Sequence, residues 1–345
     1  MGQGTGLIVK THAFGDALLT TPAVRELIRT SDCRWWALTG PSAAPIWTRF
    51  PGVEKVFTAP FPPSGLRGKL SLMIWSLGMR SSLHEVERSW VFQMDGATRR
   101  WVRFLTGSRM VSGGSQPLGA WEEARGFDPD VFAGRSYARI AGVSPQEFIP
   151  EFTPEPDEMD WARNLLEDGS WVAIAPGGGT NQRDTVLQKR WPIDEYRKIL
   201  SLLRKRGKGV VLLGGPLDRP VGSVLAESVS RDQGRVIDLT GSTDWGRTAA
   251  VLSTCGVFLG NDSGTAHAAL AVGARSVVIF GPTDPACLYP EDSIIPITSK
   301  ISCAPCYSNT VFPGCSRDGT ECMSAVSSED VWAGLERAIH ENHSS

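Results

Sequence analysis

The chain has 345 residues, of which 41% are hydrophobic and 21% charged; this excludes a disordered or fibrous protein and leaves room for two domains of about 100 to 200 residues each. The net charge of −2 at pH 7 argues against a simple nucleic-acid binder, so we expect no nucleic-acid partner. Residues 1–150 carry 17 Lys+Arg and 12 Asp+Glu, whereas residues 151–345 carry 18 and 25. A mildly basic N-terminal half suits an anionic partner, although so small an asymmetry can also be incidental.

The N-terminal half alternates apolar and helical patterns. Strands are predicted at 6–10, 34–38, 53–57 and 90–94, and helices at 17–29, 66–79 and 97–105. The first residues have neither the basic stretch nor the cleavable apolar run of a signal peptide. The most apolar segment, 70–79, is much shorter than the ~20 residues that cross a bilayer, so we expect a protein of the cytosol or of a membrane surface.

The first strand leads into the turn KTHAFGDALLTTPAV, which holds a candidate base. Gly15 allows a sharp turn, and Asp16 falls at the start of the following helix. A carboxylate in this place can remove a proton from an acceptor hydroxyl. The alternative is that Asp16 is simply the N-cap of the helix. His12 lies in the same loop and is a weaker candidate for substrate contact.

The C-terminal half shows the βα alternation more clearly. Strands are predicted at 171–175, 209–214, 235–239, 256–260 and 276–280, with helical segments between them. The helix after Pro192 has apolar residues at three- and four-residue steps and ends before Gly207; these residues are Ile193, Tyr196, Ile199, Leu200 and Leu203. The last helix begins with a capping box at 327–330.

These patterns predict an α/β fold of two doubly wound, Rossmann-like domains. The segment 148–157, rich in Pro and Glu, is the expected linker, which gives an N-terminal domain of residues 1–150 and a C-terminal domain of residues 151–345. The C-terminal domain includes a cysteine-containing loop and the final helix. In such a pair of domains we expect the ligand at the carboxyl ends of the strands, in a cleft across which the domains face each other.

A glycine-rich segment, APGGGTNQRDTVLQKRWP, follows the strand 171–175. Gly178 and Gly179 let the backbone approach a ligand closely, and Thr180 adds a hydroxyl. Lys189 and Arg190 bring cations to a leaving phosphate. The segment lacks the pattern of a P-loop, and the alternative is a flexible loop with solvated cations.

The segment GVFLGNDSGTAHAAL runs from an apolar strand into a helix near Gly264. Ser263, Gly264 and Thr265 place backbone N–H groups and hydroxyls at the positive end of that helix, which suits a diphosphate. Asp262 can cap the helix, and His267 lies one turn further along. The alternative is an ordinary cap followed by a buried histidine.

Four of the seven cysteines lie close together in the sequence, with the spacing C-x2-C-x8-C-x6-C: Cys303, Cys306, Cys315 and Cys322. They are candidates for a structural zinc or iron site. Reduced cysteines that pack as small apolar residues are the equal alternative. The D-P-D triplet at 128–130 has the form of a metal motif but lies in a Pro-containing loop, so we interpret it as a solvated turn.

Taken in order, the segments GLIVKTHAFGDALLTTPAVREL, PGGGTNQRDTVLQKRWP, LLGGPLDR, GNDSGTAHAAL and CAPC resemble the ADP-heptose:lipopolysaccharide heptosyltransferases of glycosyltransferase family 9. The resemblance covers roughly residues 6–335 and implies the GT-B fold and an inverting transfer that needs no metal or other cofactor. It implies that Asp16 is the base, that Lys189 contacts the diphosphate and sugar, and that Thr180 lies in the phosphate loop. It also places Asp262–His267 at the diphosphate and Asp218 near the nucleoside, where Asp replaces the longer Glu of many relatives.

The resemblance implies an anionic acceptor, the inner core of lipid A, on the N-terminal domain. Gly15, Arg67, Lys69 and Arg99 are the candidate acceptor contacts, and MDGATRR resembles the stretch before the acceptor-facing helix. Solvated surface arginines are the alternative. The expected function is the transfer of heptose from ADP-L-glycero-D-manno-heptose to the inner core of lipopolysaccharide, by a cytoplasmic protein in peripheral contact with the inner membrane.

Three other functions stay open. The same fold can use another nucleotide sugar or acceptor. An NAD-binding oxidoreductase is a different class, but no G-x-G-x-x-G follows a strand. A non-catalytic nucleotide-sugar-binding protein would keep Asp262–His267 and have no use for a base such as Asp16.

Overall fold

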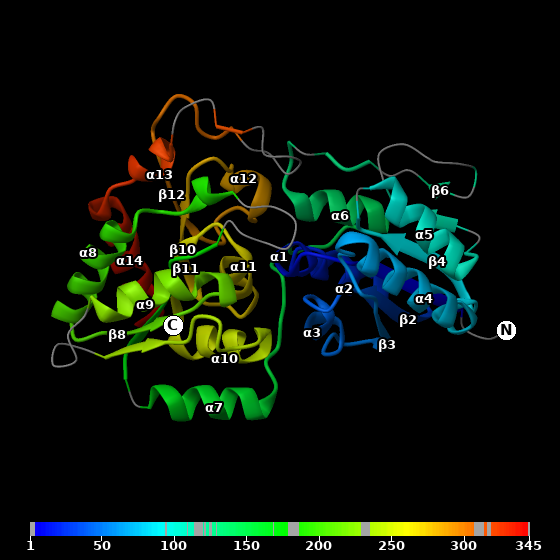
Figure 1. Cartoon of the computed structure of the whole chain (residues 1–345), viewed down its shortest axis with the longest axis horizontal. Coiled ribbons are helices and arrows are strands. Elements are labelled where there is room, and N and C mark those ends of the chain that lie inside the picture. The colour runs from blue at the N-terminus through cyan, green and yellow to red at the C-terminus, as the bar shows by residue number, and fades with distance from the viewer. Residues whose placement is uncertain are drawn as a thin grey trace. The chain divides into compact units, whose positions relative to one another are not determined.

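The structure is a computed structural model that describes residues 4–93, 95–108, 110–113, 120, 122–123, 126–128, 130–167, 169–178, 186–228, 235–306, 314–315 and 319–343. The chain divides into two compact units, unit 1 (Met1–Pro150) and unit 2 (Glu151–Ser345) (Figure 1). None of the described helices combines the length and the apolarity that a membrane-crossing helix needs.

Unit 1 is built on a parallel sheet with the strand order β3-β2-β1-β4-β5-β6. Its elements in chain order are β1 (Gly4–Lys10), α1 (Phe14–Leu18), α2 (Thr21–Thr30), β2 (Cys33–Thr39), α3 (Ala44–Trp47), β3 (Val53–Thr58), α4 (Gly65–Leu83), β4 (Val86–Val91), α5 (Gly96–Thr106), β5 (Met110–Ser112), β6 (Glu122–Glu123) and α6 (Ala133–Ala141).

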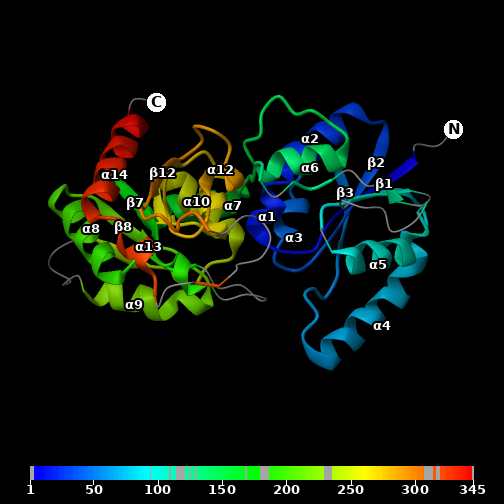
Figure 2. The ribbon, with the colours of Figure 1, turned by 90° about the horizontal axis from the view of Figure 1, so that it is seen from above.

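Helices cover both faces of the sheet in unit 1. The helices α4 and α5 lie together on one side, and α2 and α6 lie together on the other (Figure 2). The core beneath α4 and α5 contains Leu7, Val9, Leu38, Val91, Val102 and Leu105, with Leu72, Trp75 and Met79 of α4 packed against it. Burial of these apolar side chains holds the two helices on the sheet.

Unit 2 is built on a second parallel sheet, with the order β12-β11-β10-β7-β8-β9. Its helices and strands in chain order are α7 (Pro156–Leu166), β7 (Trp171–Ala175), α8 (Ile193–Lys205), β8 (Gly209–Leu212), α9 (Arg219–Glu227), β9 (Val236–Asp238), α10 (Trp245–Cys255), β10 (Val257–Asn261), α11 (Gly264–Ala271), β11 (Arg275–Phe280), α12 (Pro285–Leu288), β12 (Ile295–Thr298), α13 (Glu321–Ser324) and α14 (Ser328–His343). The 3₁₀ turns Leu187–Lys189 and Pro216–Asp218 precede α8 and α9.

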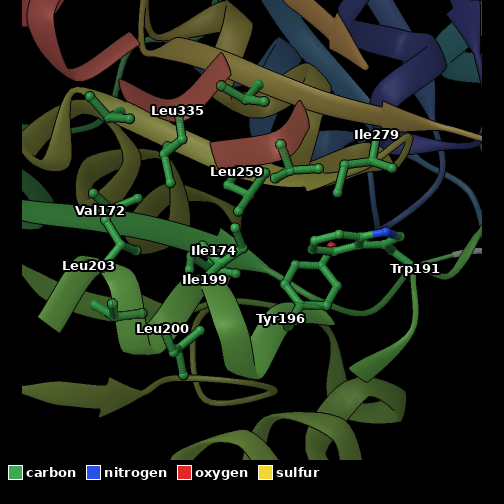
Figure 3. Packing of buried hydrophobic residues seen from close by; sticks show 14 of the residues in the cluster. Val172, Ile174, Trp191, Tyr196, Ile199, Leu200, Leu203, Leu259, Ile279 and Leu335 are labelled. Atoms are coloured by element: carbon green, nitrogen blue, oxygen red, sulfur yellow. The ribbon is translucent and has the colours of Figure 1, made fainter. Parts of the chain in front are cut away.

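Alternate strand residues and two amphipathic helices form the main core of unit 2 (Figure 3). Val172, Ile174, Leu259 and Ile279 point to one face of the sheet, because successive strand residues point to opposite faces. The predicted apolar stripe of α8 packs on this face through Tyr196, Ile199, Leu200 and Leu203. Leu335 of α14 closes the same cluster.

The prediction of two doubly wound α/β units is confirmed. The predicted strand 90–94 lies earlier, as β4 (Val86–Val91), and the prediction missed β5, β6, β12, α3, α6, α7, α12 and α13. The helix α7 begins inside the predicted linker, because Pro156 starts a helix that Glu155 and Glu158 cap. The predicted cap of the last helix is present, since Ser327 Oγ accepts the N–H of Asp330 at 3.1 Å.

The two sheets share one topology. When the strands of each unit are numbered 1 to 6 in chain order, so that β7 is the first strand of unit 2, both sheets have the order 3-2-1-4-5-6 of a dinucleotide-binding sheet. The sheet of unit 2 is read from β9 to β12 for this comparison. The direction of winding reverses between β1 and β4 in unit 1 and between β7 and β10 in unit 2. Ligands bind outside the carboxyl ends of the strands at such a reversal, so these two positions are where each unit is expected to hold its site.

Candidate functional site

The carboxyl ends of β7 and β10 bring the glycine-rich segment and the start of α11 together. The two strands pair in parallel with Ala175 opposite Gly260. Gly178 has a φ of +99°, and a Cβ on it would lie 3.1 Å from the Cβ of Ser263. A side chain at Gly177 would collide with the carboxylate of Asp218. Glycine is therefore needed here because of close neighbours and, at Gly178, because of a backbone conformation that other residues rarely adopt.

Asn261, the last residue of β10, ties these segments into one piece. Its side chain is fully buried, and its Nδ2 donates to the carbonyl oxygens of Pro176 (3.0 Å) and Gly177 (2.8 Å). Its Oδ1 accepts from the backbone N–H of Trp191 (3.2 Å) and from the hydroxyl of Tyr196 (3.0 Å). One amide thus uses both donor hydrogens and both acceptor positions to fix the glycine segment against α8.

Replacing Asn261 by leucine is expected to lower the free energy of unfolding by about 3 to 5 kcal/mol, because buried carbonyl and N–H groups lose their partners. The measurement is urea unfolding followed by circular dichroism. Tyr196→Phe is the matched control: it removes one hydrogen bond to the same amide and should cost about 1 kcal/mol. If both variants lowered the free energy of unfolding equally, the other hydrogen bonds of the Asn261 amide would not contribute to stability.

Asp218 accepts three hydrogen bonds at the end of its 3₁₀ turn. Its Oδ1 takes the N–H of Gly178 (3.1 Å) and the guanidinium of Arg190 (3.2 Å), and its Oδ2 takes the N–H of Gly215 (2.9 Å). Arg190 also donates to the carbonyl oxygen of Gly178 at 2.8 Å. Asp218 and Arg190 therefore clamp Gly178, because one binds its N–H group and the other its carbonyl group. The nucleoside contact expected for Asp218 stays a prediction.

Lys189 and Asp262 form a largely buried ion pair beside this clamp. The Nζ of Lys189 lies 2.7 Å from the Oδ2 of Asp262, whose side chain is 4% exposed. Asp262 also accepts from the hydroxyls of Thr283 (3.0 Å) and Tyr289 (3.4 Å). Burial raises the pKa of Asp262, but the electrostatic interactions with Lys189 and His267 and the hydrogen bonds outweigh it, so its pKa falls below the ordinary value. An ionised Asp262 thus fixes the ammonium group of Lys189.

The cap of α11 is Ser263 and not Asp262. The hydroxyl of Ser263 accepts the N–H of Ala266 at 3.4 Å, and the suggestion that Asp262 caps this helix is wrong because its carboxylate is turned to Lys189. His267, one turn into α11, is buried and stacks on Tyr289 with ring centroids 4.5 Å apart. The first N–H groups of the helix, at Gly264 and Thr265, lie at its positive end.

Two residues predicted for the nucleotide sugar, Gly179 and Thr180, lie outside the described residues. The structure describes the other residues predicted for the nucleotide sugar, which are Gly178, Lys189, Asp218 and the stretch Asp262–His267. They belong to one end of the unit 2 sheet, and contacts join Gly178 to Asp218 and Lys189 to Asp262.

In unit 1, Asp16 occupies the corresponding position after β1. It lies in the first turn of α1, whose N-cap is Ala13, so the alternative that Asp16 is the N-cap is wrong. Its side chain is 54% exposed, and its Oδ2 lies 3.8 Å from Nζ of the buried Lys10. Lys10 in turn donates to the carbonyl oxygen of Phe92 (3.5 Å) and the hydroxyl of Tyr137 (3.4 Å). Asp16 is therefore an accessible carboxylate beside a fixed cation.

The loop around Asp16 receives further polar side chains. His12 contacts the hydroxyl of Thr11 at 2.9 Å through Nδ1, and Gln93, which follows β4, approaches both ring nitrogens at 3.2 Å. Gly15 is buried within α1. Because β1 and β4 are neighbouring strands, the polar residues that follow them gather at the same end of the sheet.

The candidate acceptor contacts lie in different environments. Arg67 and Lys69 are exposed on α4. Arg99 on α5 is only 5% exposed, and it lies against Gly113, where an added Cβ would be 3.3 Å from the Cδ of Arg99. The three residues therefore do not form one basic surface, and acceptor binding at each of them stays a prediction.

The four clustered cysteines are reduced thiols. The Sγ of Cys315 lies 3.4 Å from the carbonyl oxygen of Gly319, and Cys306 is exposed. Among the residues that the structure describes, which include all four, no group of three or more Cys, His, Asp or Glu is arranged to hold a metal ion. The described residues therefore do not assemble the predicted zinc or iron site.

Sequence reasoning missed Lys10, Tyr137, Asn261, Thr283 and Tyr289 as parts of these two sites. Two of them could have been found from the sequence, because Lys10 and Asn261 are polar residues at the ends of otherwise apolar strands. Tyr137, Thr283 and Tyr289 gave none, since their roles depend on contacts with distant segments.

Comparison with known proteins identifies the family of this chain. The model of glycosyltransferase family 9 (heptosyltransferase) matches residues 137–314. Lipopolysaccharide heptosyltransferase 3 of Escherichia coli K12 is 30% identical over 288 residues, which cover 78% of this chain and 80% of that protein. Lipooligosaccharide heptosyltransferase 2 of Haemophilus influenzae is 32% identical over 98 residues. That match spans 28% of the length of each of the two proteins.

Solved structures define the fold class. The structure of ADP-heptose lps heptosyltransferase II of E. coli superposes with a TM-score of 0.78 at 18% identity, covering 98% of this chain and 99% of that one. The structure of E. coli heptosyltransferase WaaC with ADP-2-deoxy-2-fluoro heptose gives a TM-score of 0.67 at 17% identity, covering 98% and 99%. The fold is that of the GT-B glycosyltransferases. The chain belongs to glycosyltransferase family 9, the heptosyltransferase family.

Proposed function

We propose that this protein transfers heptose from ADP-L-glycero-D-manno-heptose to the inner core of lipopolysaccharide. The observation that carries the proposal is the ion pair of Lys189 and Asp262 beside Gly178 and the start of α11. It puts a fixed cation next to backbone that can approach a diphosphate closely. Family membership and the ADP-heptose analogue bound by the related E. coli WaaC support the choice of donor.

In the proposed reaction, the diphosphate of the donor lies against Lys189, the N-terminus of α11 and the phosphate loop that contains Gly178, Gly179 and Thr180. A helix N-terminus and an ammonium group stabilise the negative charge that grows on the departing ADP. The ion pair with Asp262 keeps the ammonium group in place before the reaction, so little reorganisation is needed.

The carboxylate of Asp16 removes the proton of the acceptor hydroxyl as its oxygen attacks the anomeric carbon. The bond from that carbon to the diphosphate breaks, ADP leaves with the electron pair, and the configuration inverts. Asp16 suits this role because it is exposed beside Lys10 after β1. The proposal routes no step through a metal ion or other cofactor.

The acceptor is proposed to be the anionic inner core on lipid A, bound by unit 1. Its candidate contacts are Gly15, Arg67, Lys69 and Arg99. The location proposed is the cytoplasmic face of the inner membrane, with peripheral contact. A structural metal at Cys303, Cys306, Cys315 and Cys322 is left out of the proposal, because among the described residues no group of three or more such side chains is arranged to hold a metal ion.

Calorimetric titration with ADP, GDP, UDP and NAD tests the donor. We expect ADP to bind at least about tenfold more tightly than GDP or UDP, because a site built for one base leaves its polar groups unpaired with another. Preference for UDP or GDP would keep the transferase and change the sugar nucleotide. Binding of NAD without preference for ADP over other diphosphates would contradict the proposal.

A further inference from the structure

The helix α4 of unit 1 presents an apolar stripe to solvent. Its members are between 50% and 84% exposed: Leu66 84%, Leu70 50%, Met73 54%, Ile74 62% and Leu77 60%. They recur at steps of three and four residues, so they share one face of the helix. The opposite face packs on the core through Leu72, Trp75 and Met79. Scattered exposed apolar residues are ordinary, but five on one helical face make a continuous patch.

Cations border this stripe on both sides. With about 100° of rotation per residue, Arg67 falls at one edge of the stripe and Lys69 and Arg80 at the other. No Asp or Glu occurs between Lys55 and His84. The patch is therefore apolar along its centre and positive along its edges.

The neighbouring helix α5 adds an exposed apolar side chain and a cation to this patch. Its Phe104 is 45% exposed and lies under Arg80, whose guanidinium carbon is 4.8 Å from the centre of the ring. Arg100 of α5 is exposed as well. The two helices lie on the same side of the sheet, so their side chains add to one surface (Figure 2).

A shallow groove of about 460 Å³ runs along α4. Its lining combines the cation of Arg67 with the apolar side chains of Leu70, Ile74 and Trp75 and the hydroxyl of Ser71. This mixture suits a molecule that has an anionic head and an apolar body.

We propose that α4 docks on the surface of an anionic phospholipid bilayer, with the apolar stripe at the boundary of headgroups and acyl chains. Helices of this kind lie in the plane of the interface, where apolar side chains enter the bilayer and cations at the edges contact lipid phosphates. The charge of the patch favours an anionic lipid surface over a second copy of the chain, since two copies would bring like charges together. The inference rests on the membrane contact of the proposed function and deepens it, because it assigns that contact to α4 and its neighbour α5 and gives Arg67 and Lys69 to lipid phosphates. Vesicle binding without lipopolysaccharide or sugar nucleotide tests it separately from sugar transfer.

Flotation of the full-length protein with vesicles tests the proposal. One set of vesicles contains phosphatidylcholine with phosphatidylglycerol, another contains phosphatidylcholine alone, and neither contains lipopolysaccharide or sugar nucleotide. We expect binding to the anionic vesicles that weakens as salt is raised. The triple variant Leu70→Ser, Ile74→Ser, Leu77→Ser should bind at least about tenfold less, because it removes the apolar stripe. The pair Arg67→Gln, Lys69→Gln should also lose at least about tenfold and much of the salt dependence.

Two matched controls keep the test specific. Val224→Ser changes an apolar residue of α9 that is 40% exposed, and Arg29→Gln removes a cation of α2 whose side chain is 69% exposed. Both should bind vesicles like the wild type. All variants are checked for an unchanged melting temperature, which is expected because the altered side chains face solvent.

Three outcomes would overturn the proposal. The α4 variants could float as the wild type does, or binding could require lipopolysaccharide in the vesicles, which would make the patch part of an acceptor site. The wild type could also ignore all vesicles and form a dimer, seen by light scattering, that the triple variant dissociates; the patch would then be a contact between copies.

Discussion

Replacing Asp16 by alanine is expected to reduce the rate of sugar transfer by about 10² to 10⁴ and to leave the affinity for ADP unchanged within about twofold. The carboxylate belongs to unit 1, at the end of β1, and is 54% exposed beside Lys10. A base that acts only on the acceptor contributes to the chemical step and not to nucleotide binding. The measurements are initial rates at saturating donor and acceptor, and calorimetry with ADP.

Two variants control this experiment. Asp16→Asn keeps the size of the side chain and removes its basicity, so it should be as slow as the alanine variant. Asp32→Ala removes an exposed carboxylate elsewhere in unit 1 and should transfer sugar at the wild-type rate. Near wild-type turnover by Asp16→Ala would mean that another group accepts the proton.

Replacing Lys189 by methionine is expected to slow turnover by about 10² to 10³, the usual effect of removing one preorganised group that stabilises developing charge. The same change leaves the buried carboxylate of Asp262 without its cation. Loss of one partner of a buried ion pair costs about 3 to 5 kcal/mol of stability, so the variant should also unfold at lower urea concentration. Steady-state kinetics and urea unfolding measure the two effects separately.

The double variant Lys189→Met, Asp262→Asn separates catalysis from stability. It removes both charges and leaves a neutral amide that Thr283 and Tyr289 can still contact. We expect most of the lost stability to return while turnover stays low. Recovery of turnover together with stability would show that Lys189 acts only by holding the fold.

Much of the fold follows from local pattern. Apolar runs predicted most of the central strands, and the apolar stripe on α8 predicted one face of the unit 2 core. Both predictions succeeded because the spacing of apolar residues and the residues that flank an element are local properties of the sequence. The short strands β5 and β6 have three and two residues, and so few positions carry no periodic signal. The predicted linker 148–157 overlaps the first two residues of α7, since the initial Pro156 reads equally well as a helix breaker.

The contacts within the sites were beyond such reasoning. The sequence places Gly178 and Ser263 in separate motifs, and only the pairing of β7 with β10 brings them together. Arg190 was proposed for a phosphate, whereas in the structure it holds Asp218 and Gly178. The burial of Arg99 likewise depends on the face that α5 turns to the sheet, and the sequence alone does not define it.

The shared winding of the two sheets also constrains the order in which the protein folds. At both reversals, the neighbouring strands are far apart in the chain: Leu7 pairs with Ser89, and Ala173 with Phe258. Closing such long loops is entropically costly and slow compared with forming a helix. In unit 2, β7, β8 and β9 leave the ribosome before β10, and Asn261 reaches the carbonyl groups of Pro176 and Gly177 only after β10 has paired. The site of unit 2 therefore cannot form from β7, β8 and β9 alone.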